Sequence, residues 1–551
     1  MHRLKSIRLY FFSILKLSLL SLRNYYLKSN YYNKKLLTFI PSRIFYEPSS
    51  YLGASLINNI GDFYKISNPS SNFLWKINTK DKQNFDNLHN FLWLTKIDRK
   101  NSKVYIKDII KSWLKNFSNY DSNAWKMEIT SKRIISWLSN TDITLQDSDK
   151  FYKEEFFKSI IKQSNFLLKN LNSLSFGSTK IICCSAIILS GIIFKENELN
   201  FKNGLKELEK IINNFFDSSG FPKTRNPEDV FVSLKYFILV REWLKESQKS
   251  IPEFLDQIIL KCGSCYIFLS SINKKFPLFN GATEIDHKEY DSFLKTQKYK
   301  FANTNNNIAG FVKIKKKKLD FIIDCGNPPS NNFLKDYQAG CLSFELNSNK
   351  HKIICNSGYA KYVNSKLSYF SRSTAAHSTL YLNDTSSCIF RKNNTINKVY
   401  GVSLVEGLKV VEKNYTESKD FYHLSASHNG YERKFGYIHT RSIKIAKKND
   451  KIFALDQLKK TKNYSNSIIF SIRFHIYPDN KIAKTKSGNS VLISLSNGEG
   501  WLLKSNSYQF KIESNIFFGN KKKIINNESV LISGILEKTD LGIEWSIERV
   551  T

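Results

Sequence analysis

The residues best suited to chemistry lie between Ser371 and Asp384, where the chain reads SRSTAAHSTLYLND. Arg372 and His377 stand here among several hydroxyl residues, just before an alternating pattern that is typical of a strand. Histidine exchanges a proton near neutral pH, and arginine binds a carboxylate or sulfate through two parallel hydrogen bonds. Arg372 could therefore face a substrate, or it could fix its own loop by pairing with Glu345 or Asp384. The sequence leaves both interpretations open.

Further histidines occur in a similar context. Five of the nine histidines fall between His377 and His475, and His428, His439 and His475 each stand beside strand-like alternation, near an aromatic residue or a glycine. Such clustering indicates a site. The alternative for His377 is a buried side chain that forms hydrogen bonds with the neighbouring hydroxyl groups.

The charge of the chain predicts an acidic partner. It has 84 Lys and Arg against 48 Asp and Glu, a formal net charge of +36, and a charge of this size attracts polyanions such as nucleic acid, anionic lipid or acidic polysaccharide. No RNP-like, zinc-finger or helix-turn-helix motif accompanies it, so we expect no nucleic-acid partner. Abundant Lys, Ile and Asn offer an alternative, a compositional bias that raises the charge without any binding role.

The eight cysteines show no spacing of a small disulfide-linked fold. Cys262 and Cys265 form a C-x-x-C pair, but no second pair at zinc-ligand spacing follows and the neighbouring residues are apolar. We interpret them as buried thiols in a core helix.

An apolar stretch from Leu9 to Leu22, interrupted by Lys16, follows a basic beginning. It is too short to span a bilayer, and nothing later in the sequence resembles a transmembrane helix. Because no small-x-small cleavage site follows, a poorly formed signal peptide and an amphipathic packing helix both remain open.

Two kinds of element must position the candidate residues. A chain of 551 residues is too long for one core, and apolar residues recur at helical spacing between about residues 80 and 272. Eight segments there predict helical hairpins in a solenoid or toroid: residues 85–94, 102–117, 129–140, 153–171, 178–194, 204–216, 229–244 and 253–272.

From about residue 298 the apolar residues alternate between Asn, Gly, Asp and Ser turns, which predicts an antiparallel sandwich. Within the helical region, Asn226 has the features of a helix N-cap, with Pro227 at the first helical position. Arg225 then lies beside a helix N-terminus, where it could hold an anion or pair with Glu228 and Asp229.

With both regions described, the chain resembles the heparinase II/III family of polysaccharide lyases. The resemblance covers about residues 85–545 and depends on a series of motifs: NFLWL, AWKMEITSKRIISWL, DSSGFPKTRNP, FPLFNG, DCGNPP, AGCLSFEL, RSTAAHSTL, SHNGY, HTR, IRFHIYP and NGEGW. It implies an N-terminal, incomplete α/α toroid followed by a C-terminal antiparallel β-sandwich. We therefore expect residues 1–80 to pack on the toroid, residues 81–290 to form it, and residues 298–551 to form the sandwich.

The resemblance also implies an enzyme that cleaves uronic-acid-containing glycans by β-elimination, and thus an acidic polysaccharide partner and a location in the cell envelope or periplasm. The weak leader and the free thiols leave the cytoplasm as an alternative. The reaction needs a group that neutralises the uronate carboxylate, a base for the adjacent carbon, and an acid for the departing oxygen.

By this resemblance His377 is the first candidate for carboxylate contact or proton transfer, and Tyr431 is the candidate acid, with Tyr369 behind it. The resemblance makes the following residues candidate substrate contacts: Arg372, Arg225, Asn226, Asn280, His428 and His439.

The chain departs from the family pattern at three places. Ser178 and Thr179 replace an Asn-His pair of the toroid, and Glu228 and Asp229 stand near the place of its tyrosine. Thr379 replaces the first zinc ligand of some relatives, so we expect no metal and no other cofactor. A glycan-binding protein that has lost the catalytic groups of the toroid is therefore the alternative to a lyase.

Overall fold

The computed structural model describes residues 2–56, 74–75, 82–100, 102–361, 365–462, 464, 467–520, 523–537 and 539–551. By its internal contacts the chain divides into two compact units. Unit 1 comprises residues 1–216 and 231–263, and unit 2 comprises residues 217–230 and 264–551. Part of the predicted 1–80 segment, residues 57–73 and 76–80, lies outside the described residues.

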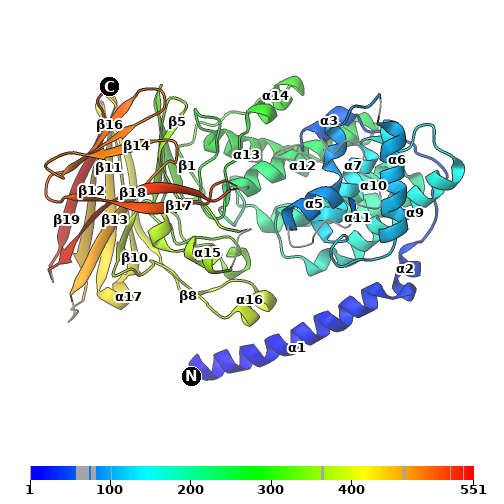
Figure 1. Ribbon diagram of the computed structural model, residues 1–551, viewed down its shortest axis with the longest axis horizontal. Helices are drawn as coiled ribbons and strands as arrows, with labels where there is room; N and C mark the ends of the chain where they lie inside the picture. Colours follow the sequence, from blue (N-terminus) through cyan, green and yellow to red (C-terminus); the bar gives the residue numbers. More distant parts are fainter. Residues whose placement is uncertain are drawn as a thin grey trace. The chain divides into compact units, whose positions relative to one another are not determined.

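Unit 1 is helical (Figure 1). Its helices are α1 (His2–Lys28), α2 (Asn30–Leu36), α3 (Ser50–Ala54), α5 (Lys82–Asn90), α6 (Lys103–Phe117), α7 (Met127–Leu138), α8 (Thr141–Thr144), α9 (Lys150–Asn170), α10 (Ser178–Ile193) and α11 (Glu198–Phe215), together with most of α12 (Pro227–Glu246) and α13 (Glu253–Leu269). Helix α10 packs against α7, α9 and α11. It is buried along nearly its whole length, because it is apolar on almost every face.

All eight predicted helical segments are helical, and one of them differs in detail. The segment 85–94 is broken at Phe91, whose φ of 57° ends α5 and starts the short 3-10 helix Leu92–Lys96. The predicted cap of α12 is confirmed, since the Asn226 side-chain oxygen accepts a hydrogen bond of 2.8 Å from the backbone N–H of Glu228.

Unit 2 contains two large antiparallel sheets (Figure 1). The first has the order β1 (Asn307–Ile308), β2 (Phe311–Lys315), β3 (Leu319–Asp324), β4 (Phe344–Ser348), β5 (His351–Cys355), β13 (Ile468–Ile476), β18 (Ile525–Leu536) and β17 (Phe510–Phe517), and β6 (Leu380–Leu382) also pairs with β13.

The second large sheet has the order β14 (Lys481–Lys484), β15 (Ser490–Ser494), β16 (Gly500–Ser505), β19 (Leu541–Arg549), β12 (Lys451–Lys460), β11 (Tyr437–Ala446), β10 (Phe421–Tyr431) and β9 (Val410–Glu417). A small third sheet pairs β7 (Ile389–Phe390) with β8 (Leu404–Glu406).

Unit 2 also contains the short helices α14 (Lys288–Thr296), α15 (Ser365–Phe370), α16 (Asn394–Tyr400) and α17 (Glu432–Phe435). Buried side chains from both large sheets form one continuous core, for example Phe344 of the first sheet stacked on Trp545 of the second. The predicted order of helices followed by an antiparallel sandwich is therefore confirmed.

Candidate functional site

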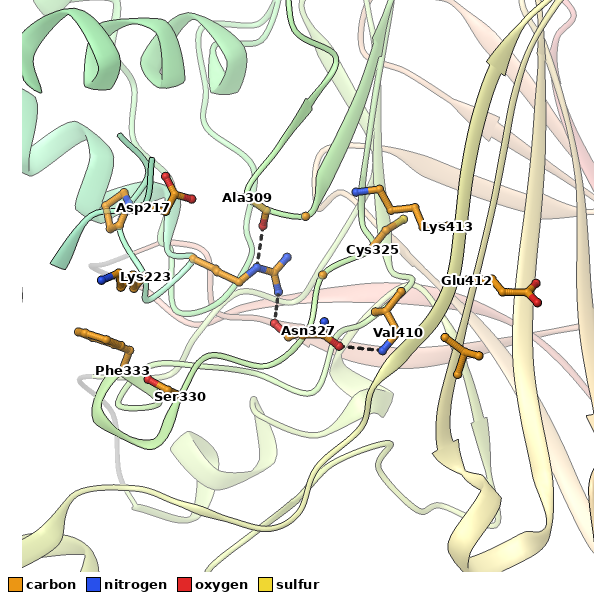
Figure 2. Close-up of a pocket in the computed structure, with 15 residues that line it drawn as sticks. Asp217, Lys223, Ala309, Cys325, Asn327, Ser330, Phe333, Val410, Glu412 and Lys413 are labelled. Carbon is orange, nitrogen blue, oxygen red and sulfur yellow. Dashed lines mark hydrogen bonds between the residues drawn. The ribbon is translucent and has the colours of Figure 1, made fainter. Parts of the chain in front are cut away.

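A cavity of about 660 Å³ lies within unit 2 (Figure 2). Four segments form its wall: the loop Asp217–Arg225 before α12, the turn Ala309–Gly310, the residues after β3, and the start of β9. Its charged lining residues are Asp217, Lys223, Arg225, Glu412 and Lys413. Three basic and two acidic residues therefore line the cavity.

Two backbone carbonyl groups and one carboxylate hold the Arg225 guanidinium in place. Its Nε donates to the Ala309 carbonyl at 2.8 Å and its Nη1 to the Asn327 carbonyl at 3.2 Å (Figure 2). Its Nη2 forms an ion pair with the buried carboxylate of Asp324. Burial alone would lower the pKa of Arg225, but the Asp324 carboxylate outweighs that effect and raises it. The residue is a fixed cation in the cavity wall, and its guanidinium contacts Ala309, Asn327 and Asp324.

Two glycines leave room for this guanidinium. A Cβ on Gly326 would lie 2.2 Å from Nη2 of Arg225, and one on Gly310 would lie 3.1 Å from the same atom. Asn280 completes the group, because its side-chain N–H donates to the Arg225 carbonyl and to Asp324 Oδ2. The structure thus brings together the predicted residues Arg225 and Asn280 around Asp324, which the sequence analysis did not single out.

The acidic residues at the start of α12 have other partners. Glu228 accepts hydrogen bonds from the backbone N–H and the hydroxyl of Thr283, and Asp229 accepts one from the hydroxyl of Thr224. Asn226 serves as the helix cap described above. Its predicted substrate contact stays a prediction.

Lys413 is the second cation in the cavity wall whose contacts are defined. Its Nζ donates to the Asn307 side chain at 2.6 Å, and burial lowers its pKa. A lysine that is partly desolvated gains more from an anionic ligand than a fully hydrated one does. The cavity can therefore accept a carboxylate or sulfate group.

His377 lies between a short 3-10 turn and β6, and it is only 1% exposed. Its Nδ1 is 2.8 Å from the Ser373 carbonyl oxygen. Because a carbonyl oxygen can only accept, Nδ1 carries the proton and Nε2 carries a lone pair. Within the described residues Nε2 has no hydrogen-bond partner. Burial lowers the pKa of His377 to about 4, so the ring is neutral at pH 7.

Gly340 lies directly against the imidazole of His377. A Cβ at this position would stand 2.6 Å from Cδ2 and 3.1 Å from Nε2 of the ring. The absence of a side chain at Gly340 therefore leaves room for the ring, and any larger residue would move the imidazole.

Arg372 fixes its own loop, but through partners that the sequence analysis did not name. Its guanidinium donates to the Leu334, Lys335 and Tyr337 carbonyl oxygens and to the Tyr359 hydroxyl. Its side chain also lies over the rings of Tyr359 and Phe390. Within the described residues, every hydrogen bond of the guanidinium goes to one of these groups, and none goes to Glu345 or Asp384.

The two candidate tyrosines differ in exposure. Tyr431 is fully buried, its hydroxyl donates to the Leu380 carbonyl at 3.0 Å, and burial raises its pKa. Tyr369 is 40% exposed at the end of α15. Neither residue lines the cavity of Figure 2.

His428 and His439 are opposite each other on β10 and β11, and both are buried. His428 Nδ1 accepts the Gly430 N–H at 3.1 Å, so its Nε2 carries the proton that points to His439 Nδ1, 3.4 Å away. His439 Nε2 in turn donates to Asp456 at 2.7 Å. Burial lowers the pKa of both histidines.

Arg441 connects this chain of contacts to the His377 segment. It donates to both carboxylate oxygens of Asp456, at 2.8 and 2.9 Å. Its Nη1 donates to the carbonyl oxygens of Leu342 and Ser378, and Ser378 follows His377 in the chain. The sequence offered one signal for this arrangement, since His439 and Arg441 are two positions apart and so share one face of a strand.

His475 belongs to the same neighbourhood. Its Nε2 donates to the Ala375 carbonyl at 3.0 Å, and its Nδ1 accepts from the side chains of Ser357 and Asn515. The four histidines of the predicted cluster are thus buried, hydrogen-bonded rings in or near the RSTAAHSTL segment.

The positions that depart from the family pattern have structural contacts. The Thr179 hydroxyl at the start of α10 donates to Glu128, and the Thr379 hydroxyl donates to the Cys341 carbonyl. Among the described residues, no three His, Cys, Asp or Glu side chains gather as metal ligands would. The expected absence of a metal stays a prediction.

Comparisons with known proteins agree with this architecture. Residues 306–546 match the family model described as Heparinase II/III-like, C-terminal. FtsZ-localized protein C of Caulobacter vibrioides is 21% identical over 516 residues, which cover 90% of this chain and 85% of that protein. A heparan sulfate lyase HepC mutant from Pedobacter heparinus has a TM-score of 0.63 at 14% identity, with 94% of this chain and 87% of that chain covered.

A crystal structure of heparinase III has a TM-score of 0.65 at 14% identity, with 90% of this chain and 80% of that chain covered. These structures confirm the predicted fold class, a helical toroid followed by a β-sandwich. Within the described residues, the helices are all too short or too polar to cross a membrane. Residues 306–546 therefore match a heparinase II/III-like C-terminal domain, which confirms the resemblance to that family that the motifs indicated.

Proposed function

We propose that the protein is a polysaccharide lyase that cleaves an acidic, uronate-containing glycan by β-elimination, with His377 as the base. The observation that carries the proposal is the buried Nε2 lone pair of His377, which accepts no hydrogen bond from the part of the chain that the structure describes. The Ser373 carbonyl fixes the tautomer and burial keeps the ring neutral. A neutral imidazole with a free lone pair is the form that removes a proton.

In the proposed reaction the base removes the proton from the carbon next to the uronate carboxylate. The electron pair of that C–H bond forms a carbon–carbon double bond, and the glycosidic C–O bond breaks. The departing oxygen then takes a proton from an acid. A cation near the carboxylate stabilises the negative charge that develops during proton removal.

The charged cavity supports an acidic ligand. Lys223 and Lys413 bring positive charge to its wall, where Arg225 is already paired with Asp324 and where Asp217 and Glu412 are also present. The net charge of +36 would also favour capture of a polyanion. We place the protein at the cell envelope, where such glycans occur, and the FtsZ-localized relative is bacterial.

The test incubates the purified protein with a panel of uronate polymers and follows the ultraviolet absorbance of the unsaturated product. His377→Gln should lower turnover by about 10²- to 10⁴-fold, the usual contribution of a general base. His351→Gln, on a half-buried histidine whose ring contacts Ser496, is the matched control and should retain turnover. Unchanged turnover in His377→Gln would exclude His377 as the base.

A second candidate is a glycan-binding protein without lyase activity. Its specific support is that the Tyr431 hydroxyl is buried and already donates to Leu380, while Ser178 and Thr179 replace the polar pair of the toroid. This candidate predicts retarded migration in gels that contain a uronate polymer, with no unsaturated product. Loss of that retardation in Lys223→Gln/Lys413→Gln would locate the binding in the cavity.

A further inference from the structure

Helix α1 exposes a row of large apolar side chains. Ile7, Phe11, Leu22 and Tyr25 are 66%, 66%, 67% and 80% exposed, and Ile14 is 45% exposed. These five residues are separated by four, three, eight and three positions, a spacing that puts them on one face of a helix. We call them the apolar row. An exposed apolar surface of this length usually marks an interaction site.

The charges of α1 all have one sign. It contains no Asp or Glu, and its basic residues are Arg3, Lys5, Arg8, Lys16, Arg23 and Lys28. At 100° per residue, Lys16 and Arg23 fall on the side opposite the apolar row. Leu9 and Leu20, 41% and 42% exposed, also lie on that side, so α1 exposes apolar side chains on more than one side and carries only basic charge.

The end of α1 contacts other helices of unit 1, whereas the side chains of the apolar row are exposed. Arg23 donates to the Asn170 side chain, and Asn24 accepts a hydrogen bond of 3.2 Å from the Tyr120 hydroxyl. Leu27 is only 7% exposed. These contacts hold the last turns of α1 and leave the part that carries most of the apolar row uncovered.

We infer that α1 binds the surface of an anionic lipid bilayer, with the apolar row in the acyl region and the basic residues at the headgroups. Helices that lie in the membrane interface are rich in Lys and Arg and in large apolar residues, as α1 is, and each Lys or Arg near an anionic surface adds to the attraction. Lys16 and the modest length of the apolar stretch exclude a spanning helix, in agreement with the described helices. A second copy of α1 is a poorer partner, because paired helices of this kind use acidic residues opposite basic ones.

The test floats the full-length protein with vesicles of phosphatidylcholine, alone or mixed with phosphatidylglycerol. The protein should float with the mixed vesicles and bind the neutral ones at least about tenfold more weakly. Phe11→Ser/Leu22→Ser should weaken binding to the mixed vesicles by at least about tenfold. Arg8→Gln/Lys16→Gln should reduce the preference for phosphatidylglycerol.

The matched control is Val104→Ser/Ile535→Ser, which changes two side chains that are 75% and 66% exposed outside α1. It should bind as the unchanged protein does. Three results would each overturn the proposal: no flotation of the unchanged protein, equal flotation of the Phe11→Ser/Leu22→Ser variant, or removal of α1 from the protein isolated from its own cells, measured by mass spectrometry. If light scattering shows that Phe11→Ser/Leu22→Ser changes only the oligomeric state, the partner of the apolar row is a second copy of the protein and not a bilayer.

Discussion

At the scale of single residues, the position of Arg225 in the cavity wall depends on neighbouring glycines, because a side chain at those positions would occupy the space of the guanidinium. Gly326 stands where a Cβ would overlap the Arg225 guanidinium, and Arg225 itself has a φ of 57°, a conformation that few residues other than glycine adopt. The ion pair with Asp324 is buried on both sides. A buried pair of this kind is costly to break, because a lone charge then remains in the interior.

Gly326→Ala should therefore displace Arg225 and lower the free energy of unfolding by about 2–4 kcal/mol. Urea denaturation of the full chain measures this change. Gly407→Ala is the matched control, since the nearest atom to its added Cβ, in Leu404, is 3.5 Å away, and it should change stability by less than about 0.5 kcal/mol. Equal stability of the two variants would contradict the structural role assigned to Gly326.

At the scale of elements, periodicity predicted the helices and many strands, but not the contacts between distant segments. The segment 178–194 was predictable because it is apolar throughout. The bulge between His428 and Tyr431 at the end of β10 was not predictable, because it is defined by the pairing of β10 with β11. The pairing of Arg225 with Asp324 joins residues 99 positions apart, and a sequence shows no local signal for such a contact.

The strands β11 and β12 carry the second prediction about stability. Among the side chains that the structure describes, Arg441→Met leaves the fully buried Asp456 with His439 and the Trp545 N–H as partners. The substitution should lower the free energy of unfolding by about 3–5 kcal/mol. Arg441→Met/Asp456→Asn should recover a large part of this loss, because it removes the uncompensated charge. Arg433→Met, on a side chain that is 79% exposed, serves as the control in the same denaturation series. Additive losses in the double variant would argue against the pair.

At the scale of the whole molecule, the histidines of unit 2 give the chain a defined response to acid. His377, His428, His439 and His475 are all buried, and burial lowers the pKa of each. An unfolded chain binds protons at these residues near pH 6.5, whereas the folded chain does so only at lower pH. The stability of the fold is therefore present in full above pH 6.5 and falls as the pH drops toward 4.

His377 alone should account for a measurable part of this fall. Its pKa of about 4 in the folded chain, against 6.5 in the unfolded chain, corresponds to about 3 kcal/mol lost between pH 7 and pH 4. His377→Gln should make the decline of the unfolding free energy with falling pH shallower over this range, while His351→Gln should leave it unchanged. Urea denaturation at a series of pH values measures both slopes. The same slope in His377→Gln and the unchanged protein would mean that the imidazole is not kept neutral by burial, and the proposed base would lose its physical support.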